Sequence, residues 1–262
     1  MGRVLAVTNQ KGGVGKTTTA VSLAAALAEA GLRVLLVDLD PQGNASSGVG
    51  VRVEPGRPTV YDVLVHDTDA VDAIEPTSVR GLFCLPATAD LAGAQIEMVT
   101  MLSREQRLRS ALADVRDEFN VVLIDCPPSL DLLTVNALTA ADGLLIPIQG
   151  EYYALEGLEA LRRNAELIRS RLNPNLEVVG LVMTMLDGRT RLSQQVVAEV
   201  ERHFGPLVFE ARIPRSVRLA EAPSHAQPIT VFDTDSPGAR AYRTLAQQVL
   251  ARLALAPAGA AR

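Results

Sequence analysis

A glycine-rich loop near the start of the chain holds the residue types that bind phosphate. The loop lies between an apolar run and a helical pattern, and its residues are Lys11, Gly12, Gly13, Val14, Gly15, Lys16, Thr17 and Thr18. Glycines allow the positive φ and close approach with which backbone N–H groups surround phosphate oxygens. Lys16 can neutralise β- and γ-phosphates, and the Thr17 hydroxyl can bind Mg²⁺. The loop therefore predicts a site for Mg-ATP.

Lys11 and Lys16 are the only lysines in the chain; every other basic side chain is arginine or histidine. A compact ammonium on a flexible stem does not do the same work as a planar guanidinium, so this pattern favours a function for both. The usual phosphate-loop spelling, G-x-x-x-x-G-K-[ST], has glycine where this chain has Gln10. Lys16 occupies the lysine position of this motif, and Lys11 is a second lysine that the motif does not require.

Carboxylates follow two of the apolar runs. Asp38 and Asp40 follow residues 33–37, and Asp125 follows residues 121–124. Carboxylates near ATP repel its phosphates unless a metal ion or water lies between them. Asp125 follows its run as a Walker B aspartate does, and we predict that it binds Mg²⁺ through water. For Asp38 we favour a structural role in capping the strand end.

Short apolar runs alternate with helical patterns along the chain. The apolar runs are residues 4–7, 33–37, 121–124, 144–148 and 178–184, and the longer helical patterns are residues 17–30, 155–172, 191–204 and 239–253. This order predicts an α/β fold with one mostly parallel, twisted sheet and helices on both faces. Ligands bind such sheets at the carboxyl ends of strands, so the loops after residues 7, 37 and 124 should converge.

We expect a single P-loop ATPase domain over residues 1–255 and a flexible tail over 256–262. The Pro-rich stretch 51–89 should hold short helices and an edge strand. The net charge of −5 excludes a general polycation, so any contact with nucleic acid needs a local basic patch. Two cysteines, no signal peptide and no apolar stretch of about 18 residues fit a cytoplasmic protein.

The loop resembles the deviant Walker A motif of the MinD/ParA branch of P-loop ATPases. Six blocks are similar to the chromosomal ParA (Soj) family and span most of the chain: NQKGGVGKTTT (9–19), VDLDPQGN (37–44), IDCPPS (124–129), EYYALEGL (151–158), DGRT (187–190) and IPRSVRLAEAPS (213–224). The resemblance implies a homodimer with two ATP molecules between the subunits. Lys11 would reach the partner subunit's nucleotide, Gly12 and Gly13 would leave room for the facing backbone, and Asp40 would orient the attacking water.

The resemblance also places adenine near the end of the 178–184 run and near residues 213–215. The candidates for base recognition are Thr184, Met185, Pro214 and Ser216. We expect a Mg-dependent ATPase that uses ATP and releases ADP, and that is weak without a partner.

Five arginines fall in two short stretches of the C-terminal third: Arg189, Arg191, Arg212, Arg215 and Arg218. Acidic residues are interspersed with them, so a solvated face is the simpler interpretation. Soj-like proteins, however, bind double-stranded DNA without sequence preference as ATP-bound dimers, through this part of the chain. The resemblance therefore implies DNA binding through Arg189, Arg215 and Arg218, and such binding should be salt-sensitive.

The favoured function is chromosome or plasmid partitioning by a nucleoid-associated ATPase, with a ParB-like centromere-binding protein as the partner that stimulates hydrolysis. A MinD-like ATPase on membranes is the first alternative, but its amphipathic C-terminal helix is not evident here, and we expect no membrane binding. An iron–sulfur reductase is the second alternative. Cys84 precedes Leu85-Pro86 and Cys126 precedes Pro127-Pro128, and neither has the glycine-flanked setting of cluster proteins, so we expect buried structural thiols.

Overall fold

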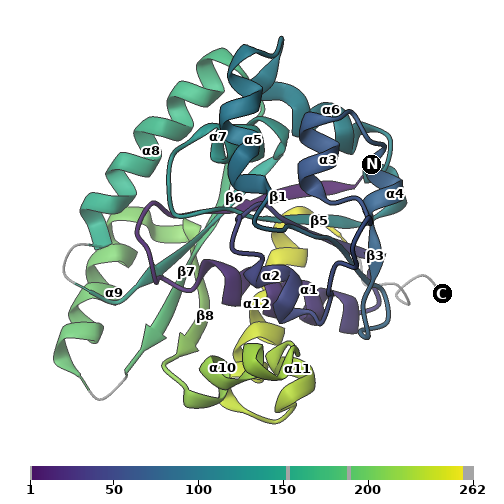
Figure 1. Cartoon of the computed structure of the whole chain (residues 1–262). Helices are drawn as coiled ribbons and strands as arrows, with labels where there is room; N and C mark the ends of the chain where they lie inside the picture. Colours follow the sequence, from purple (N-terminus) through teal and green to yellow (C-terminus); the bar gives the residue numbers. More distant parts are fainter. Residues whose placement is uncertain (1, 152–153, 188–189, 256–262) are drawn as a thin grey trace.

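The computed structural model describes residues 2–151, 154–187 and 190–255 (Figure 1). Its centre is one eight-stranded sheet with the strand order β3-β4-β2-β5-β1-β6-β7-β8. Neighbouring strands are parallel except for the short edge strand β3, which is antiparallel to β4. The strands are β1 (Arg3–Val7), β2 (Val34–Asp38), β3 (Glu75–Pro76), β4 (Leu82–Leu85), β5 (Val121–Asp125), β6 (Gly143–Gln149), β7 (Glu177–Leu186) and β8 (Val208–Pro214).

The central strands are apolar at nearly every position because helices cover both faces of the sheet. Successive side chains of a strand point to opposite faces, which divides the core in two. In β1, Val4 and Ala6 join one hydrophobic cluster, while Leu5 and Val7 join the other. The apolar runs of the sequence are thus strands buried on both sides.

Two groups of helices cover these faces (Figure 1). The first group, with the short α4 (Ala70–Ala73), consists of α3 (Val60–Val65), α5 (Leu91–Glu97), α6 (Arg107–Ala113), α7 (Leu132–Ala140), α8 (Ala154–Arg171) and α9 (Arg191–Phe204). The second group consists of α1 (Lys16–Glu29), α2 (Asn44–Gly48), α10 (Val217–Glu221), α11 (Ile229–Phe232) and α12 (Pro237–Leu253). Five 3₁₀ turns complete the described elements: Met98–Thr100, Arg104–Gln106, Arg116–Glu118, Gly205–Leu207 and Ala222–His225.

The predicted α/β fold is confirmed, and each predicted apolar run forms a strand whose bounds differ by only a few residues. The stretch 51–89 contains the short helices α3 and α4 and the edge strand β3, as expected. It also supplies β4, which pairs with β2 inside the sheet. The predicted tail 256–262 lies outside the described residues.

The register of the sheet brings the ends of three strands together. Asp125 at the end of β5 is level with Val7 of β1 on one side and with Asp38 of β2 on the other. Backbone bonds continue this arrangement beyond the strands, since Leu39 N–H donates to Asp125 O at 3.0 Å and Cys126 N–H donates to Val7 O at 3.3 Å. The predicted convergence of these loops is therefore confirmed.

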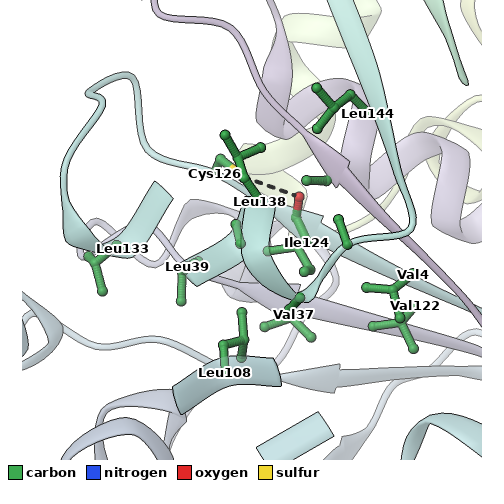
Figure 2. Packing of buried hydrophobic residues seen from close by; sticks show 14 of the residues in the cluster. Val4, Val37, Leu39, Leu108, Val122, Ile124, Cys126, Leu133, Leu138 and Leu144 are labelled. Carbon is green, nitrogen blue, oxygen red and sulfur yellow. Dashed lines mark hydrogen bonds between the residues drawn. The ribbon is translucent and has the colours of Figure 1, made fainter. Parts of the chain in front are cut away.

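A dry apolar layer supports this edge of the sheet. Figure 2 shows Val37, Leu39, Ile124 and Cys126 packed with residues of α6 and α7 in the first cluster. All four are almost completely buried. Because a close-packed core resists small displacements, it holds the loops above it in place.

No helix in the described part of the chain is both long enough and apolar enough to cross a bilayer. The longest helix of the second group, α12, directs Tyr242, Leu245 and Val249 into the core. Its apolar face packs against α1 and β8.

Candidate active site

The phosphate loop has the conformation that its glycines allow. Gly13 and Gly15 have φ angles of 75° and 83°, in the left-handed region that other residues rarely adopt. The four backbone N–H groups of residues 12–15 donate to no described residue. Exposed backbone donors at the start of a helix bind anions, so these groups fit phosphate oxygens. A Cβ at Gly12 or Gly13 would meet nothing within 4 Å, so the outer side of the loop is open.

Lys16 begins α1 and is buried. Among the described residues, its Nζ donates only to Lys11 O, at 3.3 Å. Burial lowers the pKa of Lys16, while the nearby carboxylates of Asp125 and Asp40 raise it. A buried ammonium with one weak partner is poorly satisfied, and phosphate oxygens would supply the missing negative charge.

Asp125 is completely buried beside this lysine, and neither of its carboxylate oxygens has a hydrogen-bond partner of normal geometry among the described residues. Burial raises the pKa of Asp125 well above its usual range, and the neighbouring Asp38 raises it further. Thr17 and Lys16 lower this pKa by smaller effects. An unpaired buried carboxylate next to a hydroxyl suits a divalent cation, because oxygen ligands are those that Mg²⁺ prefers.

The candidate metal ligands are few in number. No group of three or more His, Cys, Asp or Glu side chains with metal-site spacing occurs in the described part of the chain. Asp125 and the Thr17 hydroxyl therefore fit a magnesium ion that takes its other ligands from phosphate and water. Such an ion would be held only together with a nucleotide.

Asp38 and Asp40 differ in their surroundings. Asp38 is fully buried, and it accepts hydrogen bonds from Ser46 N at 2.8 Å, from Ser46 Oγ at 2.7 Å and from Asp40 N at 3.2 Å. It ties α2 to the end of β2, as the predicted structural role requires. Asp40 is half-buried, and within the described part of the chain only its Oδ1 accepts a hydrogen bond, from the N–H of Gln42 at 3.0 Å. Its Oδ2 is available to a water molecule.

The side chain of Lys11 is paired with a residue outside the phosphate loop. Its Nζ forms an ion pair with Glu151 Oε2 at 2.5 Å, and both side chains are more than one third exposed. Asn9 orients this part of the loop, since its Oδ1 accepts from Lys11 N at 3.0 Å and its Nδ2 donates to Pro147 O at 2.8 Å. Lys16 and Lys11 thus occupy an inner and an outer position.

A cavity of about 660 Å³ adjoins the phosphate loop. It is lined by all four residues predicted to recognise the base, Thr184, Met185, Pro214 and Ser216. Gly15 also lines it, and Thr184 Oγ1 donates to Val14 O at 2.8 Å, which fixes the cavity wall to the loop. The structure thus brings these residues together next to the phosphate site, in a space suited to a nucleobase.

Met185 has a φ of 52°, an unusual backbone conformation for a residue other than glycine. It lies where β7 and β8 lose their regular register, between the pairs Met183–Arg212 and Leu186–Pro214. This irregularity turns the end of β7 into the cavity wall. Strained backbone is frequent at binding sites, so the strain at Met185 supports a binding role for this cavity.

Sequence reasoning missed two contacts of the site. Tyr242, assigned to core packing, also lines the cavity beside the phosphate loop, and its hydroxyl lies 3.2 Å from Thr19 Oγ1 on α1. Glu151 lies in one of the quoted sequence blocks but had no assigned role. Both contacts join residues more than 100 positions apart. Local sequence carries no signal for such pairs.

The arginines proposed for DNA differ in how they are held. Arg215 and Arg191 are exposed, and their side chains contact no described acidic residue. Arg212 is paired with Glu201. Arg218 is paired with two carboxylates. Arg189 lies outside the described residues.

Both cysteines are buried and unpaired. Burial raises the pKa of Cys84 and of Cys126, so both stay protonated thiols. The prediction of buried structural thiols is confirmed, and neither is exposed where a cluster shared between subunits would need it.

The unpaired charge of Asp125 leads to a prediction. We expect Asp125→Asn to raise the free energy of unfolding of the nucleotide-free protein by about 1–3 kcal/mol at neutral pH, because an amide is cheaper to bury than an unpaired carboxylate. The same change should abolish Mg-dependent hydrolysis. Urea unfolding and phosphate release measure the two effects. Asp40→Asn, at the same edge but half-buried, is the control for stability.

The pH dependence follows from the sign of the shift. Folding raises the pKa of Asp125, so between the unfolded and folded pKa values the folded protein holds a proton that the unfolded chain has released. This carboxyl group therefore makes the parent more stable as the pH falls from neutral, and Asp125→Asn should lose that component. An unchanged or lower stability of Asp125→Asn at neutral pH would contradict the assignment.

Comparisons with known proteins agree with this geometry. Residues 2–178 match the AAA domain family. The chain is 53% identical over 251 residues to the sporulation initiation inhibitor protein Soj of Bacillus subtilis, which covers 96% of this chain and 99% of that protein. It is 52% identical to the chromosome partitioning protein ParA of Caulobacter vibrioides, covering 95% and 94% of the two chains.

Among solved structures, a cobyrinic acid a,c-diamide synthase from Mycobacterium smegmatis with bound ATP analogue and magnesium superposes with a TM-score of 0.85 at 39% identity, covering 97% of this chain and 96% of that one. ATP and Mg²⁺ are therefore the ligands expected of this fold. Soj and ParA, the two relatives described above, each share more than half of their aligned residues with this chain, which shows the family. The chain belongs to the Soj/ParA family of chromosome-partitioning P-loop ATPases.

Proposed function

We propose that this ATPase partitions DNA as an ATP-bound homodimer that holds double-stranded DNA and releases it after hydrolysis. One observation carries the proposal: the chain's second lysine, Lys11, lies outside the phosphate cradle, in a loop whose outer side is open. A cation in that position cannot serve the chain's own phosphates from within the loop. It is placed to serve a nucleotide held by a second copy of the chain.

Each residue of the site has a defined task in this scheme. The N–H groups of residues 12–15 and the ammonium of Lys16 bind the phosphates, and Thr17 with Asp125 would hold the magnesium ion. When bound, that ion supplies positive charge to the phosphate oxygens during transfer. Asp40 has one free carboxylate oxygen to align water. The base occupies the cavity beside Thr184 and Pro214.

Dimerisation requires additional cations at the interface, because two bound nucleotides bring many negative charges together. Lys11 would move from Glu151 to the partner's phosphates when the subunits meet. The open space beyond Gly12 and Gly13 leaves room for the facing loop.

The DNA contact is proposed for the arginines of residues 189–218. The chain carries a net charge of −5, so the contact must be local, and dimerisation would double it. Of the described arginines that the resemblance assigns to DNA, Arg215 is the one whose side chain is exposed and pairs with no described carboxylate. A ParB-like centromere-binding protein would stimulate hydrolysis and so release the dimer from the nucleoid in the cytoplasm.

The two alternatives have less support. A membrane role needs an amphipathic helix with a free apolar face, whereas the apolar face of α12 is buried in the core. An iron–sulfur role needs accessible thiols, whereas Cys84 and Cys126 are buried. Lipid pelleting and iron content would detect these activities.

The two lysines should separate nucleotide binding from dimerisation. Lys16→Ala should weaken ATP binding about 100-fold or more, because it removes the buried partner of the phosphates. Lys11→Ala should leave ATP binding by the monomer within about twofold and yet abolish dimerisation and hydrolysis. Titration with fluorescent ATP, light scattering and phosphate release test this. Normal hydrolysis by Lys11→Ala would rule out the cross-subunit role.

Removal of the water-aligning carboxylate should leave the phosphate cradle intact. We expect Asp40→Ala to hydrolyse ATP about 100-fold more slowly and to remain a dimer in ATP. Size-exclusion chromatography with light scattering should show that this dimer outlasts the parental one. A monomeric variant, or one with the parental rate, would contradict the role of Asp40.

The DNA proposal is tested first with the parent protein. Affinity for labelled double-stranded DNA should be high with a non-hydrolysable ATP analogue and low with ADP or without nucleotide. If the ATP-bound parent shows no affinity even at low salt, the partitioning proposal fails.

Arg215→Glu should then weaken DNA binding about tenfold or more and reduce the log–log salt slope by about two units per dimer, because each subunit loses a phosphate contact. Arg52→Glu, an exposed arginine outside the patch, is the control with the same charge change. Equal losses in both variants would mean that only net charge matters.

A further inference from the structure

We propose that Asp233 and Glu221 limit the DNA affinity of this protein by holding Arg218 in an ion-paired state that DNA phosphate must displace. The inference rests on the proposed DNA function and concerns the regulation of the same surface. A basic surface that binds DNA would not be expected to contain acidic residues, and the inference gives these two a role.

The carboxylates occupy most of the guanidinium edge of Arg218. Its Nε donates to Asp233 Oδ2 at 2.7 Å, and its Nη1 donates to Glu221 Oε2 at 3.1 Å. Only Nη2 makes no hydrogen bond to a described residue. Strong binding of phosphate by arginine uses two parallel N–H donors, and in this structure that pair is not free.

The surrounding fold keeps the pair in place. Glu221 is three residues after Arg218 on α10, so the two side chains share one face of the helix. Asp233 follows α11, where its own carbonyl accepts from Ser236 Oγ at 2.7 Å. The guanidinium also lies 4.4 Å from the ring centroid of Phe232. Three contacts thus hold one side chain that is still half exposed.

An anionic ligand therefore meets Arg218 under different conditions from Arg215, which pairs with no described carboxylate. A phosphate that approaches Arg218 also approaches the two carboxylates bonded to it. These carboxylates repel the phosphate while the guanidinium attracts it. An exposed ion pair of this kind is worth little to stability, so it can open. Its effect is therefore on affinity: DNA gains a two-donor contact with Arg218 only after a carboxylate gives up Nε or Nη1.

The experiment compares two isosteric charge removals that lie close together. Asp233→Asn leaves Nε of Arg218 with at most a neutral acceptor, which phosphate displaces more easily, whereas Asp235→Asn removes the same charge two residues away, from a carboxylate not bonded to Arg218. DNA affinity is measured over a range of salt with a non-hydrolysable ATP analogue. Dimerisation is measured in parallel by light scattering.

We expect Asp233→Asn to bind DNA about fivefold more tightly than the parent and to have a steeper salt slope by about one unit or more, because each subunit gains a phosphate contact. Asp235→Asn should change affinity less and leave the slope unchanged. Glu221→Gln should shift both quantities in the same direction as Asp233→Asn.

A double-mutant comparison assigns the gain to Arg218. In the Arg218→Ala background, Asp233→Asn should increase DNA affinity no more than Asp235→Asn does. Equal gains from Asp233→Asn and Asp235→Asn in the parent, or weaker binding by Asp233→Asn, would overturn the inference while leaving DNA binding itself established. A parent that binds no DNA would instead remove the function on which the inference rests.

Discussion

The buried carboxylate of Asp125 is the constraint on which the rest of the site depends. It lies level with Val7 and Asp38 in the middle of the sheet, with no hydrogen-bond partner of normal geometry among the described residues, and the ammonium of Lys16 only partly offsets its burial. A buried charge in this state is costly until a cation and its phosphates arrive. Ligand binding therefore supplies the charge balance that the nucleotide-free fold lacks. This couples the stability of the sheet edge to its occupancy.

Outside this buried centre, the cations proposed to contact a partner subunit and DNA are paired with carboxylates near the surface. Lys11 is paired with Glu151, and Arg218 with Asp233 and Glu221. Such pairs contribute little to stability in water, so they can exchange one anion for another at small cost. In the proposed function each cation would exchange a carboxylate for a phosphate. A nucleotide phosphate of the partner subunit would offer more charge than a carboxylate, whereas DNA would offer one charge per phosphate but many phosphates in a row.

The fold and the phosphate loop could be predicted because their signals are local. Apolar runs bounded by glycines and carboxylates identified β1, β2 and β5, and the parallel arrangement then placed Asp38 and Asp125 at one edge. Asp38 could be assigned a structural role, but its partner Ser46 could not, since that bond depends on how α2 folds back. Tyr242 and Glu151 were beyond local reasoning for the same reason: their contacts join segments distant in sequence.

The arrangement of α1 explains how the distant parts of the site can act together. This helix begins in the phosphate loop with Lys16, and Thr19 in its first turn contacts Tyr242 of α12. Tyr242 also lines the base cavity, whose other wall leads through Pro214 and Ser216 into α10 and Arg218. Thr19 and Tyr242 are almost completely buried, so their contact fixes the start of α1 to one wall of this cavity. In the proposed function, a nucleotide in the cavity would contact the wall from which the segment with the proposed DNA arginines continues, so nucleotide state would influence that segment within one subunit as well as through the dimer.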